Sequence, residues 1–256
     1  MKTFFLILQA EHFKCKGLMT FQILLFFPIL LTFGINIYLY SNTYNIEYYT
    51  IGDNPWIFYL ARYTFPFYTY FYPILIAVFC HAYCDVEYKN NNLKGIFTLP
   101  LKRRMIGLVK MFFVWENILL SILIAYSLFL ITGWTMSYFR PLLGYQDYDV
   151  RLITFIYFIK LFIGLTAIAL IQLCISLLIR NFAFSVSFAC FATFLPVITG
   201  QKLKYLIWIP YNGGSIALSD FIQESVILCN KTNYINTGYI VICFMLIYWS
   251  FNKLKS

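Results

Sequence analysis

Residues 85–110 read DVEYKNNNLKGIFTLPLKRRMIGLVK and separate two long apolar stretches of the chain. This segment carries six lysine and arginine residues against two acids, so it is strongly basic. Short loops rich in lysine and arginine stay on the cytoplasmic side of a membrane protein. The sequence therefore predicts that the chain crosses a membrane on each side of a cytoplasmic loop, which spans residues 85–105.

The composition of the chain favours an integral membrane protein. Hydrophobic residues make up 61% of the 256 residues and charged residues 11%, whereas soluble domains carry roughly 25% charged residues. The net charge of +9 comes from basic residues that flank apolar stretches, which indicates membrane topology and contact with anionic lipid headgroups. Nucleic acid is therefore not an expected partner.

Six apolar segments predict an all-α, polytopic membrane protein with six transmembrane helices. A spanning helix needs about 20 apolar residues to cross roughly 30 Å of hydrocarbon. Residues 1–256 are expected to form a single transmembrane domain. The predicted spans are 18–40, 64–84, 106–133, 152–179, 182–200 and 237–251.

The distribution of basic residues predicts the orientation of these spans. With the amino terminus inside, the cytoplasmic segments hold twelve lysines and arginines and the external segments hold six. Because basic residues are retained inside, the chain is predicted to lie in the plasma (cytoplasmic) membrane with both termini in the cytoplasm.

Two further elements are expected outside the spans. Residues 1–17 are predicted to form an interfacial helix on the inner leaflet, with Leu6, Ala10 and Phe13 on one face. Residues 201–236 are predicted to contain a re-entrant or lid segment on the outer face, because proline and paired glycines interrupt regular helix there.

The sequence lacks the motifs of common enzymes. It contains no HExxH zinc motif, no GxSxG nucleophile motif and no GxxxxGK[ST] phosphate loop. Cysteine and histidine residues at the end of the second span are explained better by a helix that emerges into water than by a metal site. No catalytic, metal-binding or cofactor-binding residue is therefore predicted in this chain.

Two charged residues fall inside predicted spans. Glu116 lies in the third span and Lys160 in the fourth. Intramembrane charges are costly and are usually paired or functional. Because their depths, counted from the span ends, nearly coincide, an ion pair between Glu116 and Lys160 is predicted; the alternative is that both reach an interface separately.

The basic loop is expected to present a docking surface. Asparagines at 90–92 can cap a short helix, and Pro100 can open the next one at its first turn. The result is a small apolar knob with a basic rim, which suits a groove on a soluble partner; the alternative is a basic loop lying on anionic headgroups. The knob consists of Leu93, Ile96 and Phe97, and the rim of Lys94, Lys102 and Arg103.

Two short motifs resemble the permeases of type-2 ABC transporters, most closely the group linked to lantibiotic and bacitracin immunity. The basic loop resembles that group's pattern of an acid, a polar helix, a proline, a basic residue and a lysine that opens the third span. The amino-terminal LQAEHFKCKG resembles its Glu-x-x-Lys-x-Lys start. The matching positions are Glu87, Pro100, Arg103 or Arg104, and Lys110 in the loop, and Glu11, Lys14 and Lys16 near the amino terminus.

The resemblance implies the membrane-spanning permease subunit of an ATP-driven exporter. Two such subunits, identical or paired with a sister permease, would each dock one ABC ATPase subunit, and ATP and Mg would bind to the ATPase and not to this chain. The implied substrates are amphipathic peptides, lipids or glycans. The implied ATPase-coupling residues are Glu87, Leu93, Lys94, Ile96, Phe97, Pro100, Arg103 and Lys110.

Two other classes of function compete with an exporter subunit. A membrane-embedded protease or acyltransferase would need convergent polar groups at depth, and the sequence offers few. A membrane scaffold or sensor would need no ATPase partner. An ABC ATPase in the adjacent reading frame would favour the exporter.

Overall fold

The computed structural model describes residues 2–41, 54–88, 102–139, 141, 144–199, 208–222 and 230–253. Nearly all of these residues are helical, and none of them forms a strand. Five helical segments are long and apolar enough to cross a membrane, and a sixth apolar helix is shorter. The predicted all-α polytopic membrane protein is confirmed.

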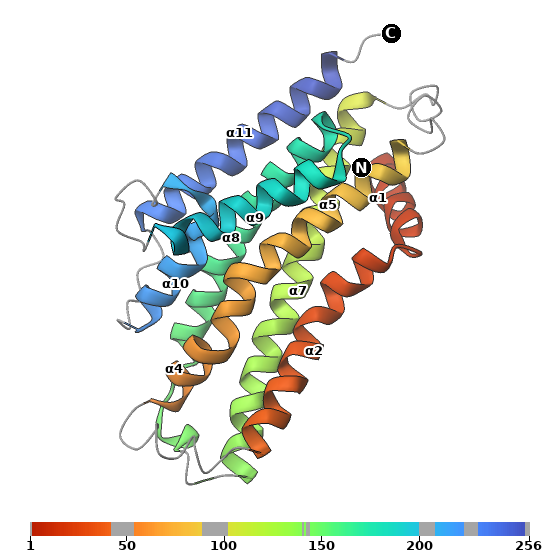
Figure 1. Cartoon of the computed structure of the whole chain (residues 1–256). Helices are drawn as coiled ribbons and strands as arrows, with labels where there is room; N and C mark the ends of the chain where they lie inside the picture. Colours follow the sequence, from red (N-terminus) through yellow and green to blue (C-terminus); the bar gives the residue numbers. More distant parts are fainter. Residues whose placement is uncertain are drawn as a thin grey trace.

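The helices form an elongated bundle (Figure 1). The first span is α2 and the second is a continuous helical rod from α4 to α5; α7, α8 and α11 are also long, and α9 is the shorter helix. The elements are α1 (Lys2–Cys15), α2 (Met19–Ser41), α4 (Pro55–Tyr59), η1 (Leu60–Thr64), η2 (Phe67–Phe71), α5 (Tyr72–Tyr88), α7 (Arg103–Phe139), η5 (Tyr145–Asp147), α8 (Arg151–Leu178), α9 (Phe182–Ile198), η7 (Pro210–Asn212), α10 (Gly213–Ile222) and α11 (Lys231–Lys253).

The second span begins earlier than the sequence predicts, at Pro55 instead of residue 64. Asn54 caps the helix, because its side chain accepts a hydrogen bond from the Trp56 backbone N–H, and Pro55 takes the first helical position. Two π-helical turns, η1 and η2, lie on either side of Pro66. Proline has no N–H to complete the regular ladder, which favours such local widening.

The last span also extends beyond its predicted start at residue 237, because α11 begins at Lys231. Its first turns are polar, so an apolar window does not detect them. In the structure Thr232, Asn233 and Asn236 are nevertheless buried. Polar residues that pack against other helices thus extend the helix beyond its apolar part.

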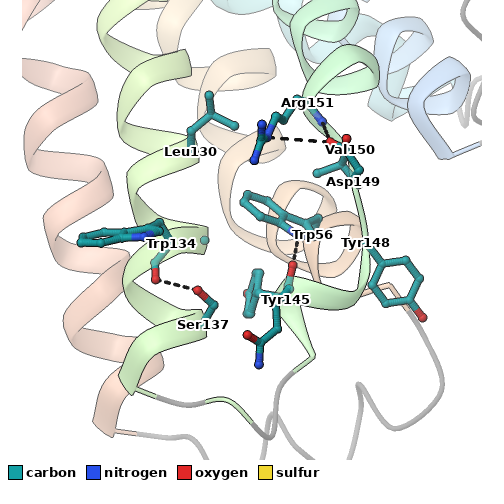
Figure 2. A pocket seen from close by; sticks show the side chains of 11 residues that line it. Trp56, Leu130, Trp134, Ser137, Tyr145, Tyr148, Asp149, Val150 and Arg151 are labelled. Atoms are coloured by element: carbon teal, nitrogen blue, oxygen red, sulfur yellow. Dashed lines mark hydrogen bonds and ion pairs between the residues drawn. The ribbon is translucent and has the colours of Figure 1, made fainter.

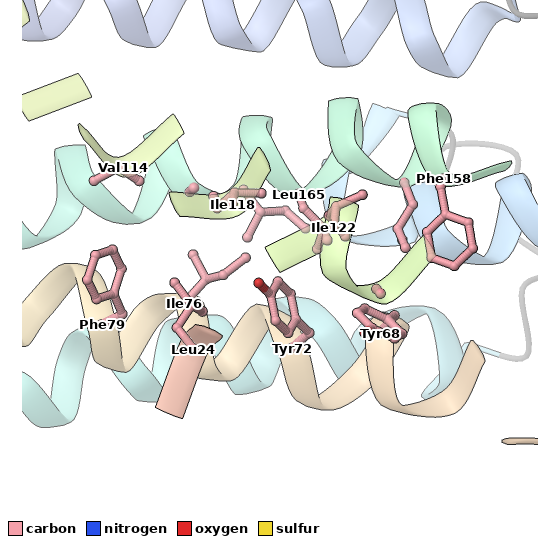
Figure 3. Close-up of a cluster of buried hydrophobic side chains, with 14 of the residues drawn as sticks. Leu24, Tyr68, Tyr72, Ile76, Phe79, Val114, Ile118, Ile122, Phe158 and Leu165 are labelled. Atoms are coloured by element: carbon pink, nitrogen blue, oxygen red, sulfur yellow. The ribbon is translucent and has the colours of Figure 1, made fainter. Parts of the chain in front are cut away.

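Helix α8 lies at the centre of the bundle and packs against α5, α7, α10 and α11. Large aromatic and branched side chains fill the core between α2, the second span, α7 and α8 (Figure 3). Among them Tyr68, Tyr72 and Tyr157 are almost fully buried. Lipid is as apolar as these side chains, so close van der Waals packing holds the helices together.

Both ends of the described chain lie at one end of the bundle, where α5 ends and α7 begins; we call this the loop end (Figure 1). Arg104 of α7 donates a hydrogen bond to the Tyr248 hydroxyl of α11 over 3.2 Å. A β-carbon built on Gly107 would lie 3.0 Å from the Phe251 ring, so α11 ends against the start of α7.

Helix α1 lies beside α7 at the loop end. Its Leu8, Glu11 and Cys15 are buried, whereas Leu6 and Phe13 of the predicted apolar face are 63% and 66% exposed. The predicted apolar face is therefore turned away from the protein, and the face that carries Leu8, Glu11 and Cys15 packs against it. Its placement on the inner leaflet stays a prediction.

Candidate functional site

Four charged side chains from three helices meet at the loop end. Lys110 Nζ of α7 lies 2.5 Å from Glu87 Oε1 of α5, and Lys14 Nζ of α1 lies 2.6 Å from the same oxygen. Lys14 Nζ also lies 2.5 Å from Glu11 Oε2, and Lys110 Nζ lies 3.6 Å from Glu11 Oε1. We call Glu11, Lys14, Glu87 and Lys110 the charge cluster.

The charge cluster is electrically balanced, and three of its four side chains are buried, whereas that of Lys14 is 20% exposed. The side chains of Lys110 and Glu87 are 1% and 3% exposed, and that of Glu11 is 8% exposed. Both ammonium groups also lie over the Tyr83 ring, at 4.7 Å for Lys14 and 4.6 Å for Lys110. Since a buried charge is costly unless it is paired and hydrogen-bonded, each member depends on the others.

Cys15 lies at the edge of the charge cluster and is fully buried. Burial raises the pKa of the Cys15 thiol to about 12, and this outweighs the neighbouring ammonium group of Lys14. The thiol is therefore protonated at neutral pH. It serves as a small buried side chain and not as a nucleophile.

The charge cluster joins the two motifs that carry the sequence resemblance. Glu11 and Lys14 come from the amino-terminal motif, and Glu87 and Lys110 come from the basic loop and its flanks. Their contact was not predicted, because no helical periodicity relates positions on separate helices.

Arg103 is the first residue of α7. The remaining predicted coupling residues, Leu93, Lys94, Ile96, Phe97 and Pro100, lie outside the described residues.

Glu116 and Lys160, predicted to form an ion pair, have different partners in the structure. Glu116 Oε2 lies 3.4 Å from His12 Nε2 of α1, and its side chain is 31% exposed. Lys160 Nζ lies 2.7 Å from Asp220 Oδ2 of α10, and its side chain is 3% exposed. The prediction is corrected accordingly.

The reason for this correction is the direction in which each side chain points. Aromatic contacts set the register of α7 against α8, with Trp115 beside Phe162 and Tyr126 beside Phe155. Glu116 and Lys160 are thus at roughly similar depth, as predicted. Glu116 points toward α1, however, and Lys160 toward α10.

Helix α10 makes polar contacts with the fourth and last spans. Asp220 accepts hydrogen bonds from Lys160 and from the Asn230 side chain, which directly precedes α11. Farther along α8, Gln172 Nε2 donates to the Tyr211 hydroxyl of η7 over 2.5 Å, and Gln172 Oε1 accepts from Ser185 of α9. The sequence did not indicate Asp220, because it lies in a segment with too few apolar residues for a span.

A cavity of about 500 Å³ lies at the opposite end of the bundle from the charge cluster, between α7 and the segment around η5. Trp56 lines it, and its indole N–H donates to the Tyr145 carbonyl oxygen over 2.9 Å (Figure 2). Burial raises the pKa of the Tyr145 hydroxyl. At the rim, Asp149 and Arg151 form a loose, exposed ion pair at 3.9 Å. Because both side chains are more than 80% exposed, neither is held in the fixed geometry that catalysis needs.

These features define a class of protein: a polytopic helical membrane protein whose buried charges join helices to one another. In the described part of the chain, no group of three His, Cys, Asp or Glu side chains could hold a metal ion.

Residues 7–196 match the family model of the ABC-2 family transporter protein. The match covers more than half of the chain, and the chain belongs to this family. It is therefore a membrane permease subunit of an ABC transporter, a transport subunit and not an enzyme. No curated protein and no solved structure matches the chain.

Proposed function

We propose that this permease subunit belongs to an ATP-driven exporter. Two such subunits, identical or paired with a sister permease, would each dock one ABC ATPase, which binds ATP and Mg. Family membership supports this assignment. The observation that carries the coupling is the charge cluster, because it lies where the basic loop leaves α5 and enters α7.

The charge cluster supports a direct path from the loop to the spans. Glu87 is the residue before the end of α5, and Lys110 lies two turns into α7. Both are tied to Lys14 or Glu11 of α1 as well as to each other. A force on the loop would therefore act on α1, α5 and α7 together, since buried charges resist separation.

The proposed substrate is an amphipathic molecule, such as a peptide antibiotic, a lipid or a glycan, moved out of the cell or the membrane. The resemblance to the immunity permeases supports a peptide and a role in antibiotic immunity. We further propose that the exposed apolar face of α1 contacts membrane lipid, because Phe5, Leu6 and Phe13 are turned away from the protein.

The coupling role of the basic loop can be tested with two apolar-to-charged changes. Leu93→Asp combined with Phe97→Asp is expected to abolish co-purification of the partner ABC ATPase, together with ATP-dependent export. A buried, unpaired charge at an interface costs several kcal/mol. The measurement is the stoichiometry of the ATPase in the purified complex.

A matched control adds the same charge to the same loop at polar positions. Asn91→Asp combined with Asn92→Asp should leave the ATPase bound, because no apolar contact is removed. Both double variants should insert into the membrane, since the changes lie outside the spans. An unchanged complex in the Leu93 and Phe97 variant would contradict the coupling role, and a wild-type chain that binds no ATPase would contradict the proposed function.

We also propose that both termini and the basic loop face the cytoplasm. Single cysteines at Asn91 and at Asp147, in a chain without its native cysteines, should label oppositely in intact cells. Asp147, in η5 at the opposite end of the bundle, should react with a membrane-impermeant thiol reagent. Asn91 should react only after the membrane is opened, and equal labelling at both positions would reject this orientation.

A further inference from the structure

We propose that the cavity of about 500 Å³ at the end of the bundle opposite the charge cluster binds the head group of a zwitterionic phospholipid. Arg151 would hold the phosphate and Asp149 the ammonium group, with the start of the lipid chains against Trp56. The inference goes beyond the proposed function, because it assigns a ligand site that needs no ATPase.

The cavity has the size and the walls of a ligand site. Such sites are clefts of about 300–1,000 Å³, lined mainly by apolar and aromatic side chains with a few polar groups. Trp56 and Tyr145 supply aromatic walls, and they are only 8% and 5% exposed. The hydrogen bond from the Trp56 indole N–H to the Tyr145 carbonyl oxygen fixes the two residues to each other. This wall is therefore formed before a ligand arrives.

Exposed aromatic residues place the cavity at the level of lipid head groups. Trp134 and Tyr148 also line it, and they are 71% and 40% exposed. Tryptophan and tyrosine are enriched at the interface between membrane and water. Arg151 is the first residue of the spanning helix α8, so the charged part of the cavity lies at a span end. A phospholipid of the adjacent leaflet would reach it without leaving the membrane.

The charges of the cavity keep atoms free for a ligand. Arg151 Nε lies 3.9 Å from Asp149 Oδ1, and the Arg151 backbone N–H donates to the same oxygen over 3.3 Å. Asp149 Oδ2 and the two Nη groups of Arg151 have no partner among the described residues. In Figure 2 the Arg151 side chain extends from the start of α8 toward α7. Its planar fork suits two oxygens of a phosphate.

The opposite charges of the pair favour a zwitterion over a simple ion. An anion on Arg151 would be repelled by the carboxylate of Asp149, and a cation on Asp149 would be repelled by the guanidinium group. A phosphate joined to an ammonium group can lie antiparallel to the pair, so that each charge meets its opposite. The exposed rings of Trp134 and Tyr148 add faces that attract a quaternary ammonium group.

The test measures protection of the cavity in the purified full chain in dodecyl maltoside, a detergent without charge. All seven native cysteines are replaced, and Ser137→Cys is introduced at the cavity wall. Hexylphosphocholine, a short-chain zwitterionic analogue, should slow maleimide labelling of position 137 in a saturable way. Arg151→Gln and Asp149→Asn should each raise the concentration for half-protection about tenfold, which corresponds to about 1.4 kcal/mol of binding. Both variants should fold, because an exposed ion pair contributes little stability.

Three related probes and a second labelling position identify what binds. Free phosphocholine should protect more weakly, because it lacks the chain that packs against Trp56. Hexyl phosphate and hexyltrimethylammonium should also protect less than hexylphosphocholine, because each is repelled by one member of the pair. Ser219→Cys, an exposed position on α10, should label at the same rate with and without hexylphosphocholine.

Three outcomes would overturn the site. The first is labelling of Ser137→Cys that hexylphosphocholine does not slow, and the second is equal protection of wild-type and Arg151→Gln chains. The third is Asp149→Asn that strengthens protection by hexyl phosphate and leaves that by hexylphosphocholine unchanged, because the cavity would then take a simple anion. Labelling involves neither ATPase nor transport, so these failures are distinct from loss of the ATPase complex, which tests the proposed function.

Discussion

Lys110→Met should produce the largest loss of stability of any single substitution in the charge cluster. The Lys110 side chain is 1% exposed, and its Nζ lies 2.5 Å from Glu87 Oε1. Its removal leaves Glu87 and Glu11 buried with only Lys14 to balance their charges. Removing one partner of a buried ion pair typically costs about 3–5 kcal/mol. We expect a large drop in the thermal unfolding midpoint of the purified chain, measured by size-exclusion chromatography after heating.

A second substitution distinguishes a paired charge from simple loss of packing. Glu87→Gln added to Lys110→Met should recover part of the lost stability, because no net charge is then left buried. Arg151→Met is the control: its ion pair with Asp149 is 85% and 81% exposed and should contribute less than about 1 kcal/mol. If Lys110→Met and Arg151→Met proved equally mild, the charge cluster would not hold the helices together.

In the proposed mechanism, the charge cluster transmits a force on the loop to the spans. Helix α1 contacts α7 through Phe4 and Phe112 as well as through charges, with ring centroids 5.5 Å apart. The end of α5, the start of α7 and helix α1 are thus joined to one another at the loop end. In this arrangement an ATPase that pushed on the loop would displace α1 and the start of α7 together.

The spans could be predicted from the sequence because their apolar length is a local property. The ends of the spans could not, wherever polar residues continue the helix. Arg62 is exposed on the second span, and Asn236 is 3% exposed on the last, packed near Gly164 and Gly213. A hydropathy scale scores both residues as polar and so places them in loops, although Arg62 is exposed on its helix and Asn236 is buried by its neighbours.

The partners of charged residues could not be predicted, because they depend on which way each helix faces. Glu116 and Lys160 were matched in depth, yet they bind His12 and Asp220 respectively. The charge cluster shows the same limit: Lys14 and Glu87 are separated by 73 positions in sequence but lie 2.6 Å apart. A single sequence indicates that such residues are important without showing which ones meet.

Gly133→Ala is expected to give the second-largest loss of stability. A β-carbon on Gly133 of α7 would lie 1.8 Å from the Trp56 indole, so the indole would have to move. Trp56 is 8% exposed, and its ring centroid lies 5.4 Å from that of Phe129 and 5.2 Å from that of Tyr145. Moving it would also break the hydrogen bond to the Tyr145 carbonyl oxygen (Figure 2).

Overpacking of this kind costs about 1–3 kcal/mol, measurable as a lower thermal unfolding midpoint with increased tryptophan exposure to a quencher. The matched control is Gly34→Ala in α2, where nothing lies within 4 Å of the added carbon. Alanine favours helix over glycine by about 1 kcal/mol, so Gly34→Ala should be neutral or stabilising. Equal effects at the two positions would show that Trp56 does not lie against Gly133. A selective loss at Gly133 would show that α4 is fixed to α7 by the close approach that only glycine permits.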